Sequence, residues 1–289
     1  MTGRIDLHTH SLKSDGAQTP ADVVRTARAA GLAAIALTDH DNIDGVSEAM
    51  AEGQRLGVEV IPGVELSAQS DTELHILGYF IDIHNKRLNE AMAYALQVRD
   101  QRQAETCRKL NEQGFQITMD ELRQEAHGNS VLCRAHFAQI MVRKGYAQSV
   151  QQAFADYLSV GCYAYSNRQA LTGPEAVSLI REAGGIAVAA HLHLIKMDDA
   201  PLAEYLASLI PYGLEGIEGY YTDYTPHMAQ RYRAMAKELG LTLSGGSDYH
   251  GANKPHISIG RGRGDLDIPY SVLEELRRRH QTKLFPDFC

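Results

Sequence analysis

The sequence lacks the features that mark secreted or membrane-embedded proteins. Cysteine is sparse and forms no CxxC pair, so we expect reduced thiols in a cytoplasmic protein. No apolar run is long enough to cross a bilayer, so no membrane partner is expected. The first residues, MTGRIDLHTH, have neither the basic start nor the apolar core of a secretion signal. The four cysteines are Cys107, Cys133, Cys162 and Cys289.

An excess of positive charge is also missing. The 28 lysines and arginines are outnumbered by 36 acidic residues, which gives a formal net charge of −8 at pH 7. A protein that wraps long nucleic acid needs a basic face, so we do not expect long nucleic acid as a partner. A small anionic substrate remains compatible, because a few arginines and bound metal ions can make one pocket positive.

Histidine, in contrast, is abundant. The chain has 13 histidines, and HxH, DHD and DxH groups each follow a short apolar run with strand character. These runs alternate with helical segments, which predicts an α/β protein with about seven parallel strands closed into a barrel. Active sites of such barrels lie at the C-terminal ends of the strands, where these histidines and carboxylates fall.

The alternation stops in the middle of the chain. Between residues 85 and 170 the strand signal disappears, and the pattern predicts helices over 88–112, 119–126, 134–144 and 149–158. We therefore expect a barrel made of residues 1–84 and 171–289. The helical insertion at 85–170 is expected to form a lid over the substrate.

The HxH pair predicts a metal site but does not establish one. His8 and His10 stand two apart on a strand, so their side chains share a face and can chelate one ion. The alternative is a pair of barrel-filling or surface histidines. Metal binding is favoured because similar groups recur, and because Glu65 lies in an apolar strand where a lone carboxylate is costly to bury. The further candidates are Asp15, Asp39, His40, Asp41, His75, His191, His193, Asp248 and His250.

The segments DLHTHSLKSDG, LTDHD, PGVELS, the His191 strand and GSDYHG resemble, in order and spacing, the motifs of the PHP phosphoesterase family. The resemblance covers residues 1–84 and 171–270 and implies a distorted seven-stranded barrel with two or three divalent ions. One departure is Leu192, where the family often has proline. By this resemblance, one ion takes His8, His10, Glu65 and Asp248, a second shares Glu65 and takes His75 and His191, and a third takes Asp15, His40 and His250. Asp39 and Asp41 are expected to support ligands or cap the loops.

The resemblance also implies a reaction. Imidazole and oxygen ligands suit Mn²⁺, Zn²⁺ or Fe²⁺, and Mn²⁺ is our first expectation. Hydrolysis by a metal-activated hydroxide needs no serine or cysteine nucleophile, and the chain has no GxSxG motif. The residues expected at the reacting centre are His8, His10, Glu65, His191 and Asp248, and His193 is a candidate for assisting the leaving oxygen.

The predicted insertion contributes candidate contacts for an anionic substrate. Arg99 and Arg102 share a helix face. Ser130 precedes a helix that begins near Arg134, and a helix N-terminus with serine and arginine is suited to phosphate. Lys196 follows the His191 strand. For each of these cations the alternative is a solvated surface charge.

The segments SVLCRAHFAQIMVRKG, GGIAVAAHLH, GIEGYY and SDYHG look like those of bacterial nucleoside 3′,5′-bisphosphate phosphatases and the related short-RNA 5′→3′ exonucleases. This resemblance implies cleavage of the 3′-phosphate of a small nucleotide such as adenosine 3′,5′-bisphosphate. Removal of nucleotides from a short 5′-phosphorylated RNA is the alternative.

Three other functions are compatible with some of these motifs but fit the whole sequence less well. Histidinol-phosphate phosphatases share the metal motifs but lack a helical insertion of this size. Amidohydrolases also use HxH on a barrel but commonly bridge their metals with a modified lysine, where this chain has Glu65. A metal-binding module without catalysis would be expected to lose ligands, and this chain keeps the full set. The tyrosines of GYYTDY are expected to pack rather than to stack on a base.

Overall fold

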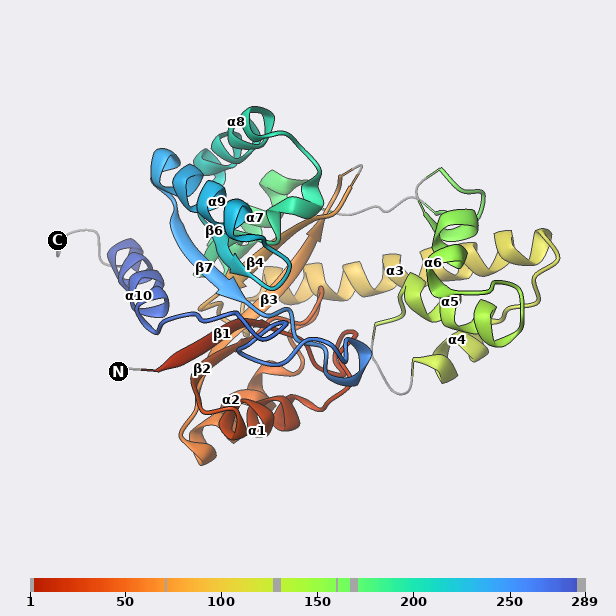
Figure 1. The fold of residues 1–289 in the computed structure, drawn as a ribbon, viewed down its shortest axis with the longest axis horizontal. Helices are drawn as coiled ribbons and strands as arrows, with labels where there is room; N and C mark the ends of the chain where they lie inside the picture. Colours follow the sequence, from red (N-terminus) through yellow and green to blue (C-terminus); the bar gives the residue numbers. More distant parts are fainter. Residues whose placement is uncertain (1–2, 71, 127–130, 160, 167–170, 285–289) are drawn as a thin grey trace.

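The computed structural model describes residues 3–70, 72–126, 131–159, 161–166 and 171–284. Seven strands form one sheet in which the spatial order follows the chain order, and the sheet curls into a nearly closed barrel (Figure 1). The predicted seven-stranded α/β barrel is therefore confirmed. The strands are β1 (Arg4–Thr9), β2 (Leu32–Leu37), β3 (Glu59–Ala68), β4 (Leu74–Tyr79), β5 (Ile186–Ala189), β6 (Leu214–Tyr221) and β7 (Thr242–Gly246).

The expectation that all strands run parallel is wrong at β4. This strand is antiparallel to both of its neighbours, β3 and β5, whereas the other neighbouring strands pair in parallel. The reason is the short connection between β3 and β4, because a parallel return needs a crossover of a dozen or more residues. A consequence is that His75, near the start of β4, lies beside the ends of parallel strands.

The gap between β1 and β7 is bridged by the loop that follows β7. The amide of Asp248 donates to the carbonyl of His8 at 3.0 Å, and the amide of His10 donates to the carbonyl of Tyr249 at 2.9 Å. The buried carboxylate of Asp6 accepts from the amides of Ser247 and Gly260. These bonds join the two ends of the sheet at the place where the HxH and DxH groups lie.

Six helices pack around the barrel, and three of them begin at a threonine whose side chain caps the first turn. Thr19 caps the first of them through the amide of Asp22, with Pro20 at the first helical position as predicted. Apolar side chains of the last helix, including Leu273 and Leu276, form one cluster with residues of several strands. The six are α1 (Pro20–Ala29), α2 (Val46–Leu56), α7 (Gly173–Glu182), α8 (Asp199–Leu209), α9 (Pro226–Leu239) and α10 (Ser271–Leu284).

The segment between β4 and α7 is helical, and its elements agree closely with the predicted ranges. The long helix α3 (Lys86–Glu112) contributes Leu88 to a barrel cluster and Leu110 to a separate cluster with the shorter helices of the segment. The helices that carry this second cluster lie at the opposite end of the molecule from α10 (Figure 1). No helix among the described residues has the length and apolar character needed to span a bilayer. The other elements of the segment are α4 (Met119–Glu125), α5 (Arg134–Arg143), α6 (Val150–Ala153) and a π-helical turn, Phe154–Leu158.

Candidate metal centre

The structure brings all nine predicted ligand side chains to one end of the barrel. His8, Glu65 and His75 project from strands β1, β3 and β4. The others lie on the short segments that follow β1, β2, β5 and β7. The strands therefore supply a rigid base, and the turns after them complete the site, as is usual for barrels of this kind. These residues on turns are His10, Asp15, His40, His191, Asp248 and His250.

Glu65 is the centre of the cluster and is fully buried. Its Oε2 atom lies 3.1 Å from His8 Nε2, 3.3 Å from His10 Nε2 and 3.0 Å from His40 Nδ1. Three imidazole nitrogens thus converge on a single carboxylate oxygen. In the absence of a cation, such packing is favourable only when the nitrogens that face the carboxylate carry a hydrogen.

The other oxygen of Glu65 faces a second group of histidines. Oε1 lies 2.9 Å from both His75 Nδ1 and His191 Nε2, and these two nitrogens are 3.2 Å apart. A carboxylate with imidazoles gathered at each oxygen has the arrangement of a group that bridges two cations. The bridging role predicted for Glu65 fits this geometry.

Two further carboxylates complete the cluster on the side of β7. Asp248 Oδ1 lies 3.2 Å from His10 Nε2 and 3.6 Å from His8 Nε2. Asp15 Oδ1 lies 3.1 Å from His250 Nε2, and Asp15 Oδ2 lies 3.8 Å from His40 Nε2. His40 therefore stands between Glu65 and Asp15, with one ring nitrogen toward each.

Three groups of these side chains have ligand atoms close enough together to hold one ion each. In addition, His10 Nε2, Asp15 Oδ1 and His40 Nδ1 are buried and make no hydrogen bond of good geometry among the described residues. Buried nitrogen and oxygen atoms that converge on one place without hydrogen bonds are suited to bind a divalent cation. The groups are His8, His10 and Glu65; His40, Glu65 and His75; and His10, Asp15, His40 and His250.

The carboxylates control the charge of the rings in the metal-free protein. Burial alone would lower the pKa of His10, but contacts with Asp248 and Glu65 outweigh it and raise the pKa to about 9. Burial also opposes the charged form of Glu65, yet the surrounding imidazoles, through charge and hydrogen bonding, hold its pKa well below the usual range. His40 behaves differently, because burial dominates and lowers its pKa to about 3. The site is thus built around a carboxylate that stays ionised.

Sequence reasoning missed one buried carboxylate at the site. Glu218 on β6 is fully buried, its Oε1 lies 3.0 Å from His8 Nδ1, and its Oε2 accepts the amide of His191 at 2.6 Å. It therefore orients one ring and one backbone turn. The signal was present, because Glu218 lies in an apolar strand, LEGIEGYY, as Glu65 does in PGVELS.

Asp39 and Asp41 have the supporting places expected of them. Asp39 accepts from the amide and hydroxyl of Ser11, both at 2.7 Å. Asp41 accepts from the amide of Ser67 at 2.9 Å and from Arg99 Nη2 at 2.5 Å. These bonds fix the turn that carries His40 between β1, β3 and the long helix α3.

The departure at Leu192 is accommodated by a tight turn. His191 has a φ of 26°, and the chain continues as a 3₁₀ turn, Leu192–Ile195, with Leu192 buried. The amide of Leu192 donates to the hydroxyl of Tyr224 at 2.8 Å. Tyr221 donates to Asp248 Oδ2 at 2.9 Å, so these two tyrosines support the site through hydrogen bonds, and their rings pack against His193.

The cluster lies along a cavity of 520 Å³ that reaches the helical segment. His193 and three of the predicted substrate contacts, Arg99, Arg102 and Arg134, line it. Arg99 is held by Asp41, and the guanidinium of Arg134 donates to the carbonyl of Leu158.

The other two predicted substrate contacts are Lys196 and Ser130. Lys196 is exposed and is not among the residues that line the cavity, and Ser130 lies outside the described residues. Among the basic side chains that line the cavity, His256 and Lys254 were not predicted, and Lys254 Nζ is 2.7 Å from Asp248 Oδ2. Both lie in a loop without regular periodicity, so no sequence pattern singled them out.

A barrel with imidazoles and carboxylates gathered at its strand ends is typical of metal-dependent hydrolases. The chain belongs to the PHP-domain family, whose model matches residues 6–248. It is a metal-dependent phosphoesterase, in agreement with the resemblance noted in the sequence.

Characterised relatives cover nearly the whole chain but differ in substrate. A 5′-3′ exoribonuclease of Haemophilus influenzae is 33% identical over 86% of this chain and 91% of its own length. A 3′,5′-nucleoside bisphosphate phosphatase of Chromobacterium violaceum is 30% identical over 95% of this chain and 97% of its own. A phosphoribosyl 1,2-cyclic phosphate 1,2-diphosphodiesterase of Eggerthella lenta is 28% identical over 88% of this chain and 97% of its own length. The names of all three relatives imply hydrolysis of a phosphate ester, but their substrates differ.

Two solved structures have the same fold. A protein described as an amidohydrolase from Chromobacterium violaceum, with bound sulfate and no metal, has a TM-score of 0.84 and 30% identity and covers 96% of each chain. A protein described as a metal-dependent phosphoesterase from Bifidobacterium adolescentis has a TM-score of 0.81 and 29% identity, over 95% of this chain and 96% of its own.

Proposed function

We propose that the protein hydrolyses the 3′-phosphate of nucleoside 3′,5′-bisphosphates, for example adenosine 3′,5′-bisphosphate to AMP and phosphate. The observation that carries this proposal is the single cavity lined by His75 and His191 of the metal cluster and by Arg134 of the helical segment. In such a cavity the reacting phosphate can lie at the metal cluster, while a second phosphate binds the guanidinium of Arg134. The relative from Chromobacterium violaceum named for this activity supports the choice.

Two to three divalent ions, with Mn²⁺ as the first choice, are part of this proposal. One ion would be held by His8, His10, Glu65 and Asp248. A second ion would be held by His75 and His191 together with Glu65, which it would share with the first. Asp15, His40 and His250 would hold the third. When bound, the ions would supply Lewis-acid polarisation of the phosphoryl oxygens and activation of water at neutral pH.

The protein's own side chains would position the substrate. Arg134 is the first residue of α5, so the 5′-phosphate would meet both its guanidinium and the N-terminal amides of a ten-residue helix. Its guanidinium carbon lies 5.8 Å from the ring centre of Phe154 and 5.6 Å from that of Tyr165, in cation–π contact with both. Lys254, held by Asp248, lines the same cavity and would add positive charge near the reacting phosphate. In this proposal the segment 85–170 acts as the substrate lid.

A second candidate is 5′→3′ exonuclease activity on short 5′-phosphorylated RNA. The Haemophilus influenzae relative with that name is the observation that favours it. Both activities break a bond between a phosphorus and the 3′-oxygen of a nucleotide whose 5′-phosphate is bound, so the site chemistry serves either. The difference lies in whether a further nucleotide is attached to the reacting phosphate.

The test is phosphate release from adenosine 3′,5′-bisphosphate by the Mn²⁺-loaded protein. A short 5′-phosphorylated RNA and histidinol phosphate serve as competing substrates. We expect rapid phosphate release from the bisphosphate, abolished by His8→Ala and by chelator. Arg134→Ala should raise KM for the bisphosphate, while Arg123→Ala, which changes an exposed arginine of α4 outside the cavity, is the matched control. Mononucleotides released from RNA with little free phosphate would support the exonuclease, and inactivity on the bisphosphate with metal bound would refute the proposal.

A further inference from the structure

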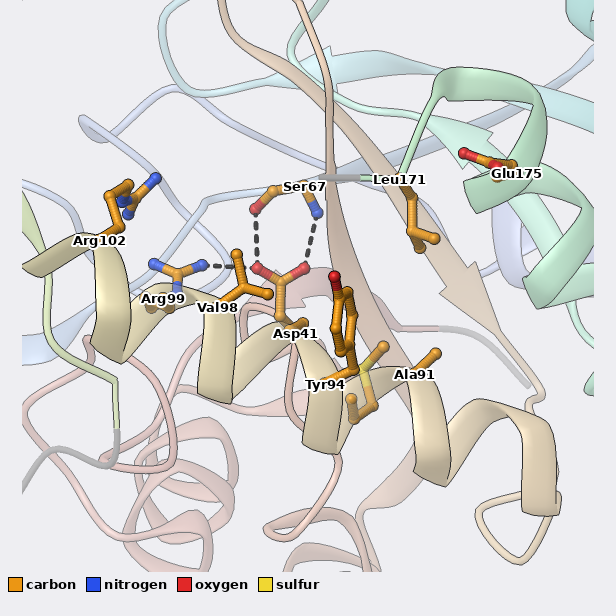
Figure 2. A pocket seen from close by; sticks show the side chains of 11 residues that line it. Asp41, Ser67, Ala91, Tyr94, Val98, Arg99, Arg102, Leu171 and Glu175 are labelled. Carbon is orange, nitrogen blue, oxygen red and sulfur yellow. Dashed lines mark hydrogen bonds and ion pairs between the residues drawn. The ribbon is translucent and has the colours of Figure 1, made fainter. Parts of the chain in front are cut away.

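Beside the catalytic cavity lies a second, smaller cavity of 240 Å³. It is bounded by the first half of α3, the end of β3 and the start of α7 (Figure 2). No part of the proposed reaction uses its walls beyond the residues shared with the larger cavity. Its lining consists of Asp41, Ser67, Ala91, Met92, Tyr94, Ala95, Val98, Arg99, Arg102, Leu171 and Glu175.

The two cavities share a border. Ser67, Arg99 and Arg102 line both of them. Ser67 follows the central carboxylate, Glu65, by two residues on the same strand, so it faces the same side about 7 Å further along. The smaller cavity therefore begins roughly one sugar ring away from the place where the reacting phosphate would be bound.

The walls and the floor of this cavity have different chemistry. Figure 2 shows Ala91, Tyr94 and Val98 projecting from α3 toward Leu171, which gives small apolar walls with one aromatic ring. The floor is polar, and its groups already bond to one another, since Asp41 accepts from Ser67 and from Arg99. A flat ligand with apolar faces fits between such walls better than a second phosphate does.

The aromatic ring is placed where a ligand can reach it. Tyr94 is 57% exposed although it lines a cavity, whereas most of the large apolar side chains of the barrel are buried. A nucleobase gains about 1–3 kcal/mol by stacking on an aromatic side chain, with little dependence on which base is present. An exposed ring next to a phosphoesterase site thus has the properties of a base platform.

We propose that this side cavity holds the nucleobase of the nucleotide whose 3′-phosphate is cleaved, with the base against Tyr94 and the α3 wall. The inference rests on the proposed function, because it takes the ligand to be a nucleotide. It adds a contact in the helical segment, separate from the phosphate contacts, that would favour nucleotides over base-free sugar phosphates. Because the walls are apolar and the polar floor groups are paired, the cavity would accept a purine or a pyrimidine with modest preference.

The chain has no tryptophan, so a Tyr94→Trp variant would carry a single indole whose fluorescence reports on the cavity. Tyr212→Trp is the matched control, because Tyr212 is 46% exposed and lines neither cavity. We expect AMP to quench the fluorescence of Tyr94→Trp, ribose 5-phosphate to leave it unchanged, and Tyr212→Trp to respond to neither. Calorimetry on the unmodified protein shows independently whether AMP binds.

Kinetics give a second readout. In Tyr94→Ala the ratio of kcat/KM for adenosine 3′,5′-bisphosphate to that for a base-free 1-deoxyribose 3,5-bisphosphate should fall about tenfold. Bisphosphate turnover and AMP binding without quenching would overturn this inference and leave the proposed function standing. Quenching by AMP without bisphosphate turnover would support a base site in this cavity and refute the proposed function. Quenching by a dinucleotide but not by AMP would assign the cavity to the second nucleotide and overturn the inference, and no binding of AMP at all would overturn both.

Discussion

Glu218→Gln should weaken metal binding although this residue is not a proposed ligand. For His8 to offer Nε2 to an ion, its Nδ1 must carry the proton and donate it to Glu218 Oε1, 3.0 Å away. The other oxygen of Glu218 accepts the amide of His191 at 2.6 Å. Both bonds run toward the carboxylate, so the residue must act as an acceptor at each end.

Glutamine cannot accept at both ends. If its NH₂ group faces His8, the ring must present Nδ1 as an acceptor, which moves the proton to Nε2 and blocks the ligand atom. If the NH₂ group faces His191 instead, two donors meet in a fully buried place. Loss of a partner that orients a metal ligand typically costs 10–100-fold in metal affinity, or about 1.4–2.7 kcal/mol.

The assay is titration of the metal-free variant with Mn²⁺ by calorimetry, with phosphate release measured alongside. The matched control is Tyr79→Phe, which removes the buried bond from Tyr79 to Ser244 at 2.8 Å in the same barrel without touching a proposed ligand. We expect the control to lose stability and keep its Mn²⁺ affinity. A folded Glu218→Gln protein that binds Mn²⁺ as tightly as the unmodified protein would refute the tautomer argument.

Three further outcomes are expected. Removal of metal by chelator should lower the unfolding temperature, because an ion at 100 times its Kd stabilises the folded state by about 2.7 kcal/mol, and a thermal shift assay with and without Mn²⁺ checks this. Arg134→Ala should raise KM for a bisphosphate about tenfold or more through loss of a charge-assisted bond, with Arg134→Lys intermediate, as measured by steady-state kinetics. Phe137→Ala, in the buried cluster of the helical segment, should cost about 3–5 kcal/mol in denaturant unfolding, and unchanged stability would contradict the packing described above.

Much of the site could be predicted because its residues lie at positions that periodicity identifies. His8 and His10 follow from the two-residue repeat of a strand, and Glu65 from the cost of burying a carboxylate. Their convergence follows from the rule that ligands gather at the strand ends of a barrel. The helical segment was also predictable, because α3 begins and ends within two residues of its expected range.

The remainder depends on tertiary contacts that no local pattern encodes. The direction of β4 follows from the length of one connection, which sequence periodicity alone does not reveal. Lys254 reaches Asp248 from an irregular loop. Arg99 lines the cavity, as the prediction required, but its partner within the protein depends on which loop packs against the helix. Here that loop carries Asp41.

The backbone of the site indicates that function rather than stability fixes its turns. Asp41, His191 and Asp248 have φ values of 48°, 26° and 58°, a region that costs residues with a side chain about 1–3 kcal/mol. Each strained amide is held by another member of the site: Asp41 by the carbonyl of Glu65, His191 by Glu218, and Asp248 by the carbonyl of His8. Glycine would adopt these turns without strain, but it would remove two proposed ligands and the group that holds Arg99. The network therefore stabilises three unfavourable turns that aim their side chains, and for this reason replacement of Glu218, which contacts both His8 and His191, is expected to weaken metal binding although Glu218 is not a ligand.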